Sequence, residues 1–236
     1  MSGPNPSYYY YYTTTTVPAP QVHHTTSGIE IRDLTIAFAV LTFDLMVIIG
    51  SLSLFAGVSS LAGFLSLRTF AIAATAAVTG FLAHELAHKF VAQRYHAWAE
   101  FRMSPVGLVV SVLTATFGFL FAAPGATVVG GMTDLREWGR TSLAGPMTNL
   151  AFAFVFLAGA LVAGLAQLSA GAIGVLLWLT FFNGWFATFN LLPFGPLDGA
   201  KVRRWNTSTW AVAIVVCGLT TIVGALFLYG QIPVPA

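Results

Sequence analysis

Two histidines four residues apart, His84 and His88, lie inside an otherwise apolar run, and no other feature constrains the chain as strongly. The flanking residues 69–83 and 90–92 are alanine, glycine, threonine and larger apolar residues. On a helix, side chains four positions apart point about 40° apart, so both imidazoles share one face with Glu85 close beside them. This His-Glu-x-x-His pattern is typical of a catalytic zinc site, in which the histidines bind the metal and the glutamate accepts a proton from water.

The same pattern can also arise by accident, as the charged and solvated face of a soluble helix. Here its flanks would place the three polar groups in or near hydrocarbon. A charged side chain at the centre of a bilayer costs about 2.5 to 3.5 kcal/mol on insertion scales, so such residues persist mainly where they have a function and a partner. We therefore interpret the pattern as a metal site.

The composition places the whole chain in a membrane. Its 236 residues are 57% hydrophobic and 8% charged, whereas soluble domains carry about 25% charged residues. A helix of about 21 residues reaches across the roughly 30 Å of bilayer hydrocarbon. We expect an all-α polytopic membrane protein with about five transmembrane helices, at residues 34–54, 69–91, 143–165, 172–192 and 209–229.

The N-terminal residues differ from the rest in composition. Residues 8–12 are all tyrosine, four threonines follow, and no apolar period is present. Such a segment cannot bury enough apolar surface to fold alone. We expect residues 1–28 to form a disordered or loosely attached tail, and residues 29–236 to form the transmembrane domain.

A third metal ligand can be sought among the few acidic residues. The chain has eight, and those after the histidines are Glu100, Asp134, Glu137 and Asp198. The first three stand among arginines in polar segments, as ordinary solvated residues do. Asp198 instead follows a stretch with two prolines and a glycine that should end a helix near the membrane surface. Irregular backbone at that depth is tolerated around a protein-lined cavity, so Asp198 is the favoured ligand.

Three motifs now occur in a fixed order along the chain: His84-Glu85-x-x-His88, Gly145-Pro146-x-x-Asn149, and Asn190-Leu-Leu-Pro followed by Asp198-Gly199. In order and approximate separation they resemble the site-2 protease family of intramembrane zinc metalloproteases, over residues 29–204. The resemblance implies that three helices hold one zinc ion per chain. It also implies that residues 29–236 are a metalloprotease domain that cleaves a transmembrane segment of a substrate protein within the bilayer.

The resemblance also implies roles for individual residues. His84, His88 and Asp198 match the family's zinc ligands, Glu85 matches its general base, and Asn190 matches an asparagine that contacts the substrate or the transition state. For Asn190 and for Asn149, hydrogen bonding between helices is an equally good interpretation. The chain departs from the family in having Ala200 where a second glycine is frequent, and in the long apolar run at residues 105–124.

The ligand positions predict part of the topology. Asp198 can meet the histidines only if the second and fourth helices run in the same direction, and the third helix already reverses the chain once. Residues 105–129 must then cross the membrane an even number of times, which for so short a segment means a re-entrant hairpin or loop. We expect this segment to offer an edge strand to an extended substrate.

The basic residues predict the orientation. With this topology and the N-terminus inside, nine of the ten lysines and arginines fall on the cytoplasmic side and only Arg68 falls outside, as the positive-inside rule favours. We expect a multi-pass protein of the cell membrane, with the N-terminus and the zinc end cytoplasmic. Its expected partners are the lipid bilayer and a transmembrane protein or peptide substrate, with no nucleic acid.

The alternative function is a non-proteolytic membrane scaffold or transporter that only holds zinc. A transporter would need a file of polar or acidic residues across several helices. Asp44 is the one membrane-embedded acid outside the expected site, and it can equally be protonated or bonded to a neighbouring helix. The sequence therefore favours the protease.

Overall fold

The structure is a computed structural model that describes residues 26–50, 61–121 and 123–235. The predicted tail at residues 1–28 lies almost entirely outside the described residues, as does the end of the predicted first helix, residues 51–54. The described chain is mostly helical, with a single pair of short strands, which confirms the predicted fold class.

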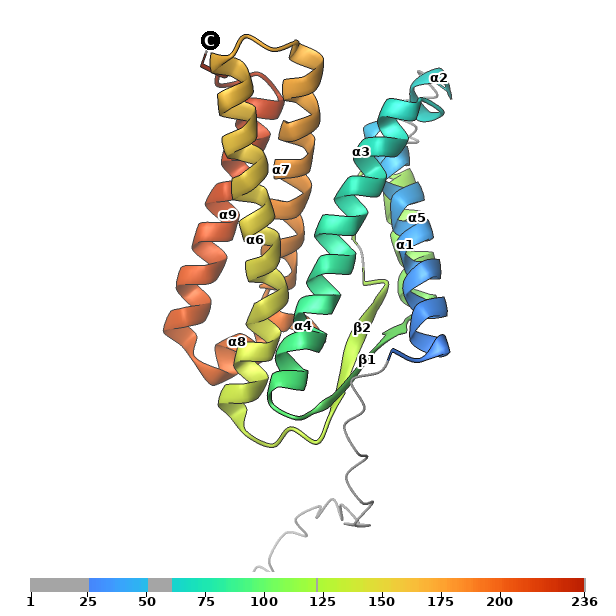
Figure 1. Cartoon of the computed structure of the whole chain (residues 1–236), viewed down its shortest axis with the longest axis vertical. Coiled ribbons are helices and arrows are strands. Elements are labelled where there is room, and N and C mark those ends of the chain that lie inside the picture. The colour runs from blue at the N-terminus through green and yellow to red at the C-terminus, as the bar shows by residue number, and fades with distance from the viewer. Residues whose placement is uncertain (1–25, 51–60, 122, 236) are drawn as a thin grey trace, which may run out of the picture.

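Five long helical columns make up most of the described part of the chain (Figure 1). They are α1 (Gly28–Ile49), the continuous helix of α3 (Leu67–Ala77), η1 (Val78–Leu82) and α4 (Ala83–Arg94), and then α6 (Leu135–Leu165), α7 (Ala170–Asn190) and α9 (Thr207–Leu228). Three short helices accompany them: α2 (Leu61–Phe64), α5 (Pro105–Thr116) and α8 (Asp198–Trp205).

Among the described residues, four of these columns are long and apolar enough to cross a membrane, namely Leu67–Arg94, α6, α7 and α9. The remaining column, α1, packs against α3 and α5. It holds Glu30, Arg32, Asp33 and Asp44, so that any 18 consecutive residues of α1 include at least three charged ones, whereas each of the other four columns has an apolar window of 18 residues with at most two. The chain is thus a polytopic helical protein suited to a bilayer.

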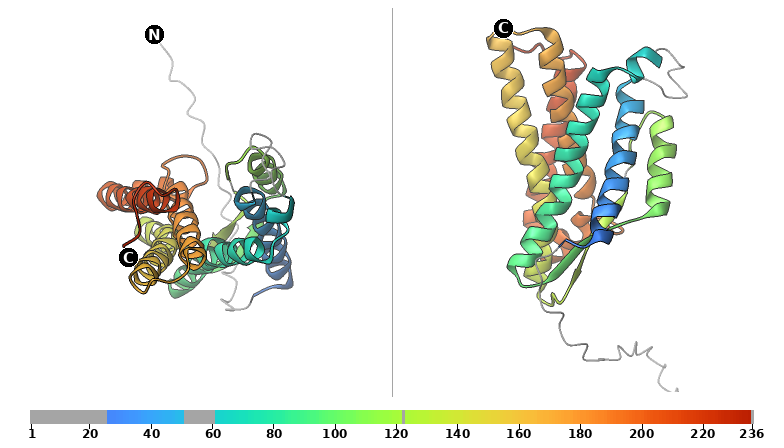
Figure 2. Two further views of the ribbon diagram at one scale, coloured as in Figure 1. Left: turned by 90° about the horizontal axis from the view of Figure 1, so that it is seen from above. Right: turned by 45° about the vertical axis from the view of Figure 1, so that its right-hand side comes forward.

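The segment between α4 and α6 leaves one end of the molecule and returns to it. Strand β1 (Trp98–Met103) precedes α5 and strand β2 (Gly125–Gly130) follows it. The two strands pair antiparallel, with Trp98 opposite Gly130 and Met103 opposite Gly125. Because paired strands lie side by side, the segment makes no net crossing, as the predicted re-entrant hairpin requires (Figure 2).

The helix directions agree with the parity argument. In Figure 1, α4 and α7 both descend toward the end that holds the strands, and α6, which separates them in the sequence, runs the opposite way. Small residues allow these helices to pack closely: a Cβ on Gly80 would lie 2.4 Å from the ring of Phe186 on α7, and one on Gly139 would lie 2.4 Å from Trp205 on α8. This packing brings α8 to the foot of α6, near the end of α4.

The first turns of α1 hold β1 in place. The carboxylate of Glu30 is buried in an ion pair with Lys89 of α4 and also accepts the backbone N–H of Phe101 at 3.1 Å. Two residues along the strand, the backbone N–H of Met103 donates to Asp33 Oδ2 at 3.2 Å. Side chains of α1 therefore occupy the edge of β1 that faces away from β2.

Candidate metal centre

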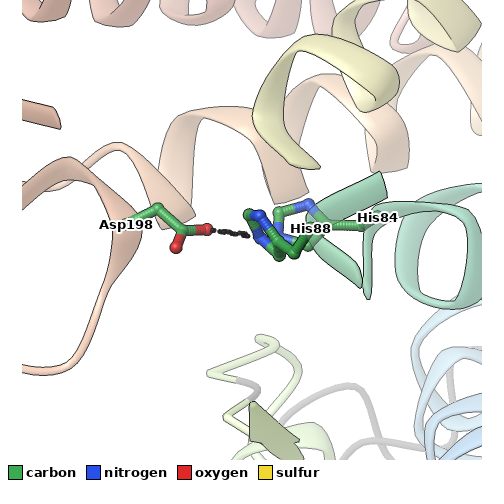
Figure 3. Close-up of side chains that lie close together, drawn as sticks. All are labelled: His84, His88 and Asp198. Carbon is green, nitrogen blue, oxygen red and sulfur yellow. Dashed lines mark hydrogen bonds and ion pairs between the residues drawn. The ribbon is translucent and has the colours of Figure 1, made fainter. Parts of the chain in front are cut away.

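The side chains of His84, His88 and Asp198 lie close together (Figure 3). They come from α4 and α8, which lie at the foot of the bundle (Figure 1). Asp198 Oδ2 lies 3.3 Å from His84 Nε2 and 3.0 Å from His88 Nε2, and the two Nε2 atoms are 3.0 Å apart. All three residues are buried, with exposed fractions of 3%, 6% and 8% in sequence order. Among the described residues, they form the grouping of histidine, cysteine and acidic side chains that could hold a metal ion.

The turn between α7 and α8 brings Asp198 to this place. Residues 191–197 leave the helix, Gly195 takes a φ of +62° that favours glycine, and Asp198 is the first residue of α8. The next residue, Gly199, has no room for a side chain, because a Cβ there would lie 2.0 Å from the carbonyl oxygen of Leu191. The Asp-Gly sequence therefore lets α8 begin directly against the end of α7.

Asn149 on α6 fixes the orientation of His84. Its amide nitrogen donates to the carbonyl oxygen of Gly80 at 2.8 Å, and its Oδ1 lies 2.8 Å from His84 Nδ1. A backbone carbonyl can only accept, so the amide oxygen of Asn149 must face the imidazole. His84 Nδ1 then carries the proton, and its Nε2 presents a lone pair to Asp198 and His88.

A backbone carbonyl orients His88 in the same way. His88 Nδ1 lies 2.7 Å from the carbonyl oxygen of Thr141 on α6. That oxygen has no proton to give, so Nδ1 donates and His88 Nε2 is left with a lone pair. Hydrogen bonds from the outer nitrogen of each ring are the usual partners of metal-binding histidines.

The site thus brings together the Nε2 lone pairs of two histidines and one carboxylate oxygen. The hydrogen bonds described above put the imidazole protons on the Nδ1 atoms, and therefore none between these three atoms. A bound cation would satisfy two Nε2 lone pairs and one carboxylate oxygen at once. Metal bonds of about 2.0 to 2.1 Å in tetrahedral geometry place ligand atoms about 3.3 Å apart, close to the distances of 3.0 to 3.3 Å between these atoms. Two histidines and one carboxylate are also a ligand set of catalytic zinc.

Gly145 on α6 leaves space beside the donor atoms. A Cβ at this position would lie 2.5 Å from His88 Nε2 and 2.6 Å from His84 Nε2. Real Cβ atoms do not approach other atoms this closely. The glycine of the Gly145-Pro146-x-x-Asn149 motif therefore keeps open the place where the donors converge, and the asparagine orients one of them.

Glu85 lies beside the three donors and faces the strands. Both its Oε2 and its carbonyl oxygen contact Thr127 of β2. Glu85, Thr127 and Asn190 line one cavity together with the three donor residues. Water admitted to this cavity would meet a carboxylate beside a candidate metal position.

The two asparagines of the sequence motifs differ in their contacts. Asn149 bonds across helices to His84 and Gly80, as described above. Asn190 lies on the cavity wall, and its amide nitrogen donates to the carbonyl oxygen of Phe186 at 3.0 Å, within its own helix. Asp44 is fully buried in α1 and is not among the residues that line the cavity.

Two of the other acidic residues weighed as ligands have partners elsewhere. Asp134 caps α6, where its Oδ1 accepts the backbone N–H of Arg136 at 2.6 Å. Glu100 on β1 accepts bonds from Ser27 and Arg102. Burial raises the pKa of this carboxyl, but the Arg102 guanidinium and the Ser27 hydroxyl lower it by more, so the pKa lies below its usual value.

Sequence reasoning missed Thr127 and the Thr141 carbonyl, both of which contact residues of α4. No local pattern marks either one, because each contact joins residues more than 40 positions apart. The space beside Gly145 was missed as well, although the motif that contains this glycine was recognised. A glycine next to a proline within an apolar helix was the available signal.

Comparison with known proteins agrees with this chemistry. No protein-family model and no solved structure matches the chain. A protein of Methanocaldococcus jannaschii named putative zinc metalloprotease is 40% identical over 153 residues, which cover 62% of this chain and 76% of that protein. The putative zinc metalloprotease Rip3 of Mycobacterium tuberculosis is 36% identical over 124 residues, which cover 52% of this chain and 28% of Rip3.

The chain matches the archaeal relative over most of that protein's length, at an identity that establishes common descent. The chain also has a His-His-Asp grouping able to bind a metal ion. The cofactor is accordingly zinc. The chain belongs to the zinc metalloprotease family of its archaeal relative and is a membrane-type metalloprotease hydrolase.

Proposed function

We propose that the chain is an intramembrane zinc endopeptidase of the site-2 protease kind, which hydrolyses a peptide bond within or near a transmembrane segment of a substrate protein. One observation carries the proposal: a buried His-His-Asp donor set lies beside Glu85 in a bundle of four helices apolar enough to cross a bilayer. A protease that acted only on soluble substrates would have no need to embed its site among such helices.

In this proposal, His84, His88 and Asp198 hold one zinc ion through Nε2, Nε2 and Oδ2. When bound, zinc acts as a Lewis acid that lowers the pKa of water and polarises the scissile carbonyl. Glu85 accepts the proton of the attacking water at Oε1, because its Oε2 is bonded to Thr127. The same carboxyl group then gives the proton to the leaving amine nitrogen.

Asn190 is proposed to contact the substrate. Its side chain lies on the wall of the same cavity, so its amide can reach a peptide held there. The bond from Asn190 Nδ2 to the Phe186 carbonyl leaves Oδ1 to accept a substrate N–H. Asn190→Ala should raise KM more than it lowers kcat, and an unchanged KM would contradict the contact.

The paired strands support an extended mode of substrate binding. Glu30 and Asp33 occupy the outer edge of β1, whereas Gly125, Thr127 and Val129 of β2 line the cavity. A helical substrate hides its amide groups and must unwind before attack. We propose that the unwound segment lies along β2, where backbone hydrogen bonds can hold it extended. Crosslinks from Val129 that reach neighbouring residues of this chain but never a bound substrate would count against this.

The orientation is proposed from charge. Basic residues concentrate at the end of the molecule that holds α8 and the strands, and Arg68 lies toward the other end. We propose that this end and the N-terminus are cytoplasmic. In intact cells, an impermeant maleimide should label Leu168→Cys and spare Asn206→Cys, since these exposed positions lie at opposite ends. The reverse labelling would invert the topology. The native Cys217 is buried.

A zinc-holding scaffold or transporter is the competing function. Among the described residues, the one grouping that could hold a metal is the His-His-Asp set, so no succession of sites leads an ion across the described bundle. Nothing observed favours this alternative over proteolysis.

The deciding experiment compares wild type with Glu85→Gln, Asp198→Ala and the matched control Glu137→Gln, a glutamate of the first turn of α6 outside the cavity. Each purified protein is assayed for zinc content and for cleavage of a reconstituted transmembrane substrate. Wild type and the control should hold zinc and cleave. Glu85→Gln should keep zinc and lose roughly 10²- to 10⁴-fold in rate, and Asp198→Ala should lose zinc.

Two results would overturn the proposal. Cleavage by Glu85→Gln at the wild-type rate would remove the assigned base. Full zinc binding by wild type without cleavage of any transmembrane substrate, across a panel of single-span proteins, would favour the scaffold.

A further inference from the structure

We propose that Thr127 is a positioning residue that holds the Glu85 carboxylate in place for proton transfer. The inference rests on the proposed function, because it assigns a task to a residue that supports the base and does not itself touch the reacting atoms. The residue lies on β2, within the re-entrant segment, and 42 positions separate it from Glu85.

Thr127 supplies two donors to a single oxygen of Glu85. Its backbone N–H donates to Oε2 at 2.9 Å, and its hydroxyl Oγ1 donates to the same Oε2 at 2.8 Å. The hydroxyl also lies 3.2 Å from the Glu85 carbonyl oxygen, but it has one proton and the carboxylate is closer and charged. Among the described residues, Thr127 is the sole hydrogen-bond donor to this side chain, which leaves Oε1 without a hydrogen-bond partner in a residue that lines the cavity.

The register of the strands explains why the backbone N–H is available. Thr127 lies opposite Phe101 in the antiparallel pair, and the N–H of Phe101 donates to Glu30 rather than to β2. The two residues are therefore a pair that exchanges no backbone hydrogen bonds, and both N–H groups point outward. One of them meets α1, and the other meets Glu85 on α4.

The two hydrogen bonds from Thr127 restrain the Glu85 side chain, and this restraint matters for proton transfer. A glutamate side chain loses about 1.5 to 2 kcal/mol of rotamer freedom when it is fixed, and a base works well only when it is held within about 0.5 Å of its productive position. Two charge-assisted hydrogen bonds to Oε2 supply that restraint. They also leave Oε1 as the oxygen that can take the proton.

A purely structural role for Thr127 would be different. The residue could simply anchor β2 to α4 through the Glu85 backbone. Loss of such an anchor would displace β2 and impair substrate binding, whereas loss of the restraint on Oε2 would slow the chemical step after normal binding.

The test uses Thr127→Val, which removes the hydroxyl and keeps the backbone N–H, and Thr127→Ser, which keeps both donors. Thr220→Val is the matched control, because the one partner of the Thr220 hydroxyl among the described residues is the Val216 carbonyl of its own helix. Thr127→Val should lower kcat about 10- to 100-fold with KM and zinc content unchanged. Thr127→Ser and Thr220→Val should keep wild-type kcat. A raised KM with unchanged kcat would overturn the proposal in favour of the anchor.

A second measurement needs no activity. The chain has four glutamates, Glu30, Glu85, Glu100 and Glu137, so the infrared difference between ¹³C-glutamate-labelled wild type and Glu85→Gln isolates the Glu85 carboxylate band. That band should shift in Thr127→Val and return in Thr127→Ser. An unshifted band would overturn the positioning role, whereas a shifted band in a protein that cleaves no substrate would instead overturn the proposed function.

Discussion

Replacing Gly145 with alanine tests whether the donor atoms really share one metal ion. The change adds a single methyl group to α6. Its carbon would lie 2.5 Å from His88 Nε2 and 2.6 Å from His84 Nε2, and ordinary contact begins at 3.4 Å. The nearer nitrogen must therefore retreat by 0.9 Å (3.4 − 2.5), or α6 must move away from α4 by a similar amount.

The size of this displacement sets the expected loss of zinc affinity. A functional zinc site tolerates deviations of about 0.2 Å in its bond lengths, which is much smaller than the shift. Loss of one orienting partner already weakens metal binding about 10- to 100-fold. We expect Gly145→Ala to weaken zinc binding at least about 100-fold, equivalent to about 2.7 kcal/mol. The helix itself should not suffer, because alanine is favoured over glycine in a helix interior by about 1 kcal/mol.

The assay is zinc retention by the detergent-purified protein during titration with a chelator of known affinity. Gly159→Ala is the matched control on the same helix, since a Cβ there would meet Leu176 at 3.6 Å, an ordinary contact. The control should retain zinc as wild type does. If Gly145→Ala holds zinc as tightly as Gly159→Ala, the space beside Gly145 is not where the metal binds, and the three-donor site must be abandoned.

Three further substitutions test the surroundings of the site. Asn149→Ala should weaken zinc binding about 10- to 100-fold because His84 Nδ1 loses its acceptor at 2.8 Å; Asn149→Asp keeps an acceptor and should lose less, and equal losses in the same chelator titration would contradict the orienting role. Gly199→Ala should release zinc, since its Cβ would lie 2.0 Å from the Leu191 carbonyl and Asp198 would shift; retained zinc would refute this. Glu30→Gln leaves Lys89 buried without its charged partner. The free energy of unfolding, measured with denaturant in detergent, should fall by about 3 to 5 kcal/mol, and adding Lys89→Met should recover part of the loss.

Much of the architecture could be predicted from local patterns. Apolar runs of about twenty residues located the columns that became α6, α7 and α9, although α6 begins at Leu135 rather than near 143. Hydropathy predicts only the apolar part of a helix, so it missed the polar first turns of α6, which follow the Asp134 cap. For the same reason, the charged first turns of α1 were left out of the predicted first helix, which was expected to begin at residue 34 and begins at Gly28.

The relative directions of the helices were also predictable, by a different argument. A ligand set split between the ends of two helices fixes their directions, and the re-entrant segment followed from that requirement. What hydropathy could not provide was the internal structure of the segment. Residues 105–124 are apolar enough to suggest one continuous helix, but α5 ends at Thr116, two residues before Gly118 takes a φ of +86°. The chain pairs with β1 only from Gly125 onward.

Residue types and their spacing were enough to predict the chemistry of the site. Helical periodicity alone places His84, His88 and Glu85 on one face, and a short supply of acidic residues singles out Asp198. How these groups are held became visible only in the folded chain. Thr127 bonds to Glu85 across 42 positions and the Thr141 carbonyl bonds to His88 across 53. Such contacts depend on how strands and helices pack, and neither residue type nor spacing records that packing.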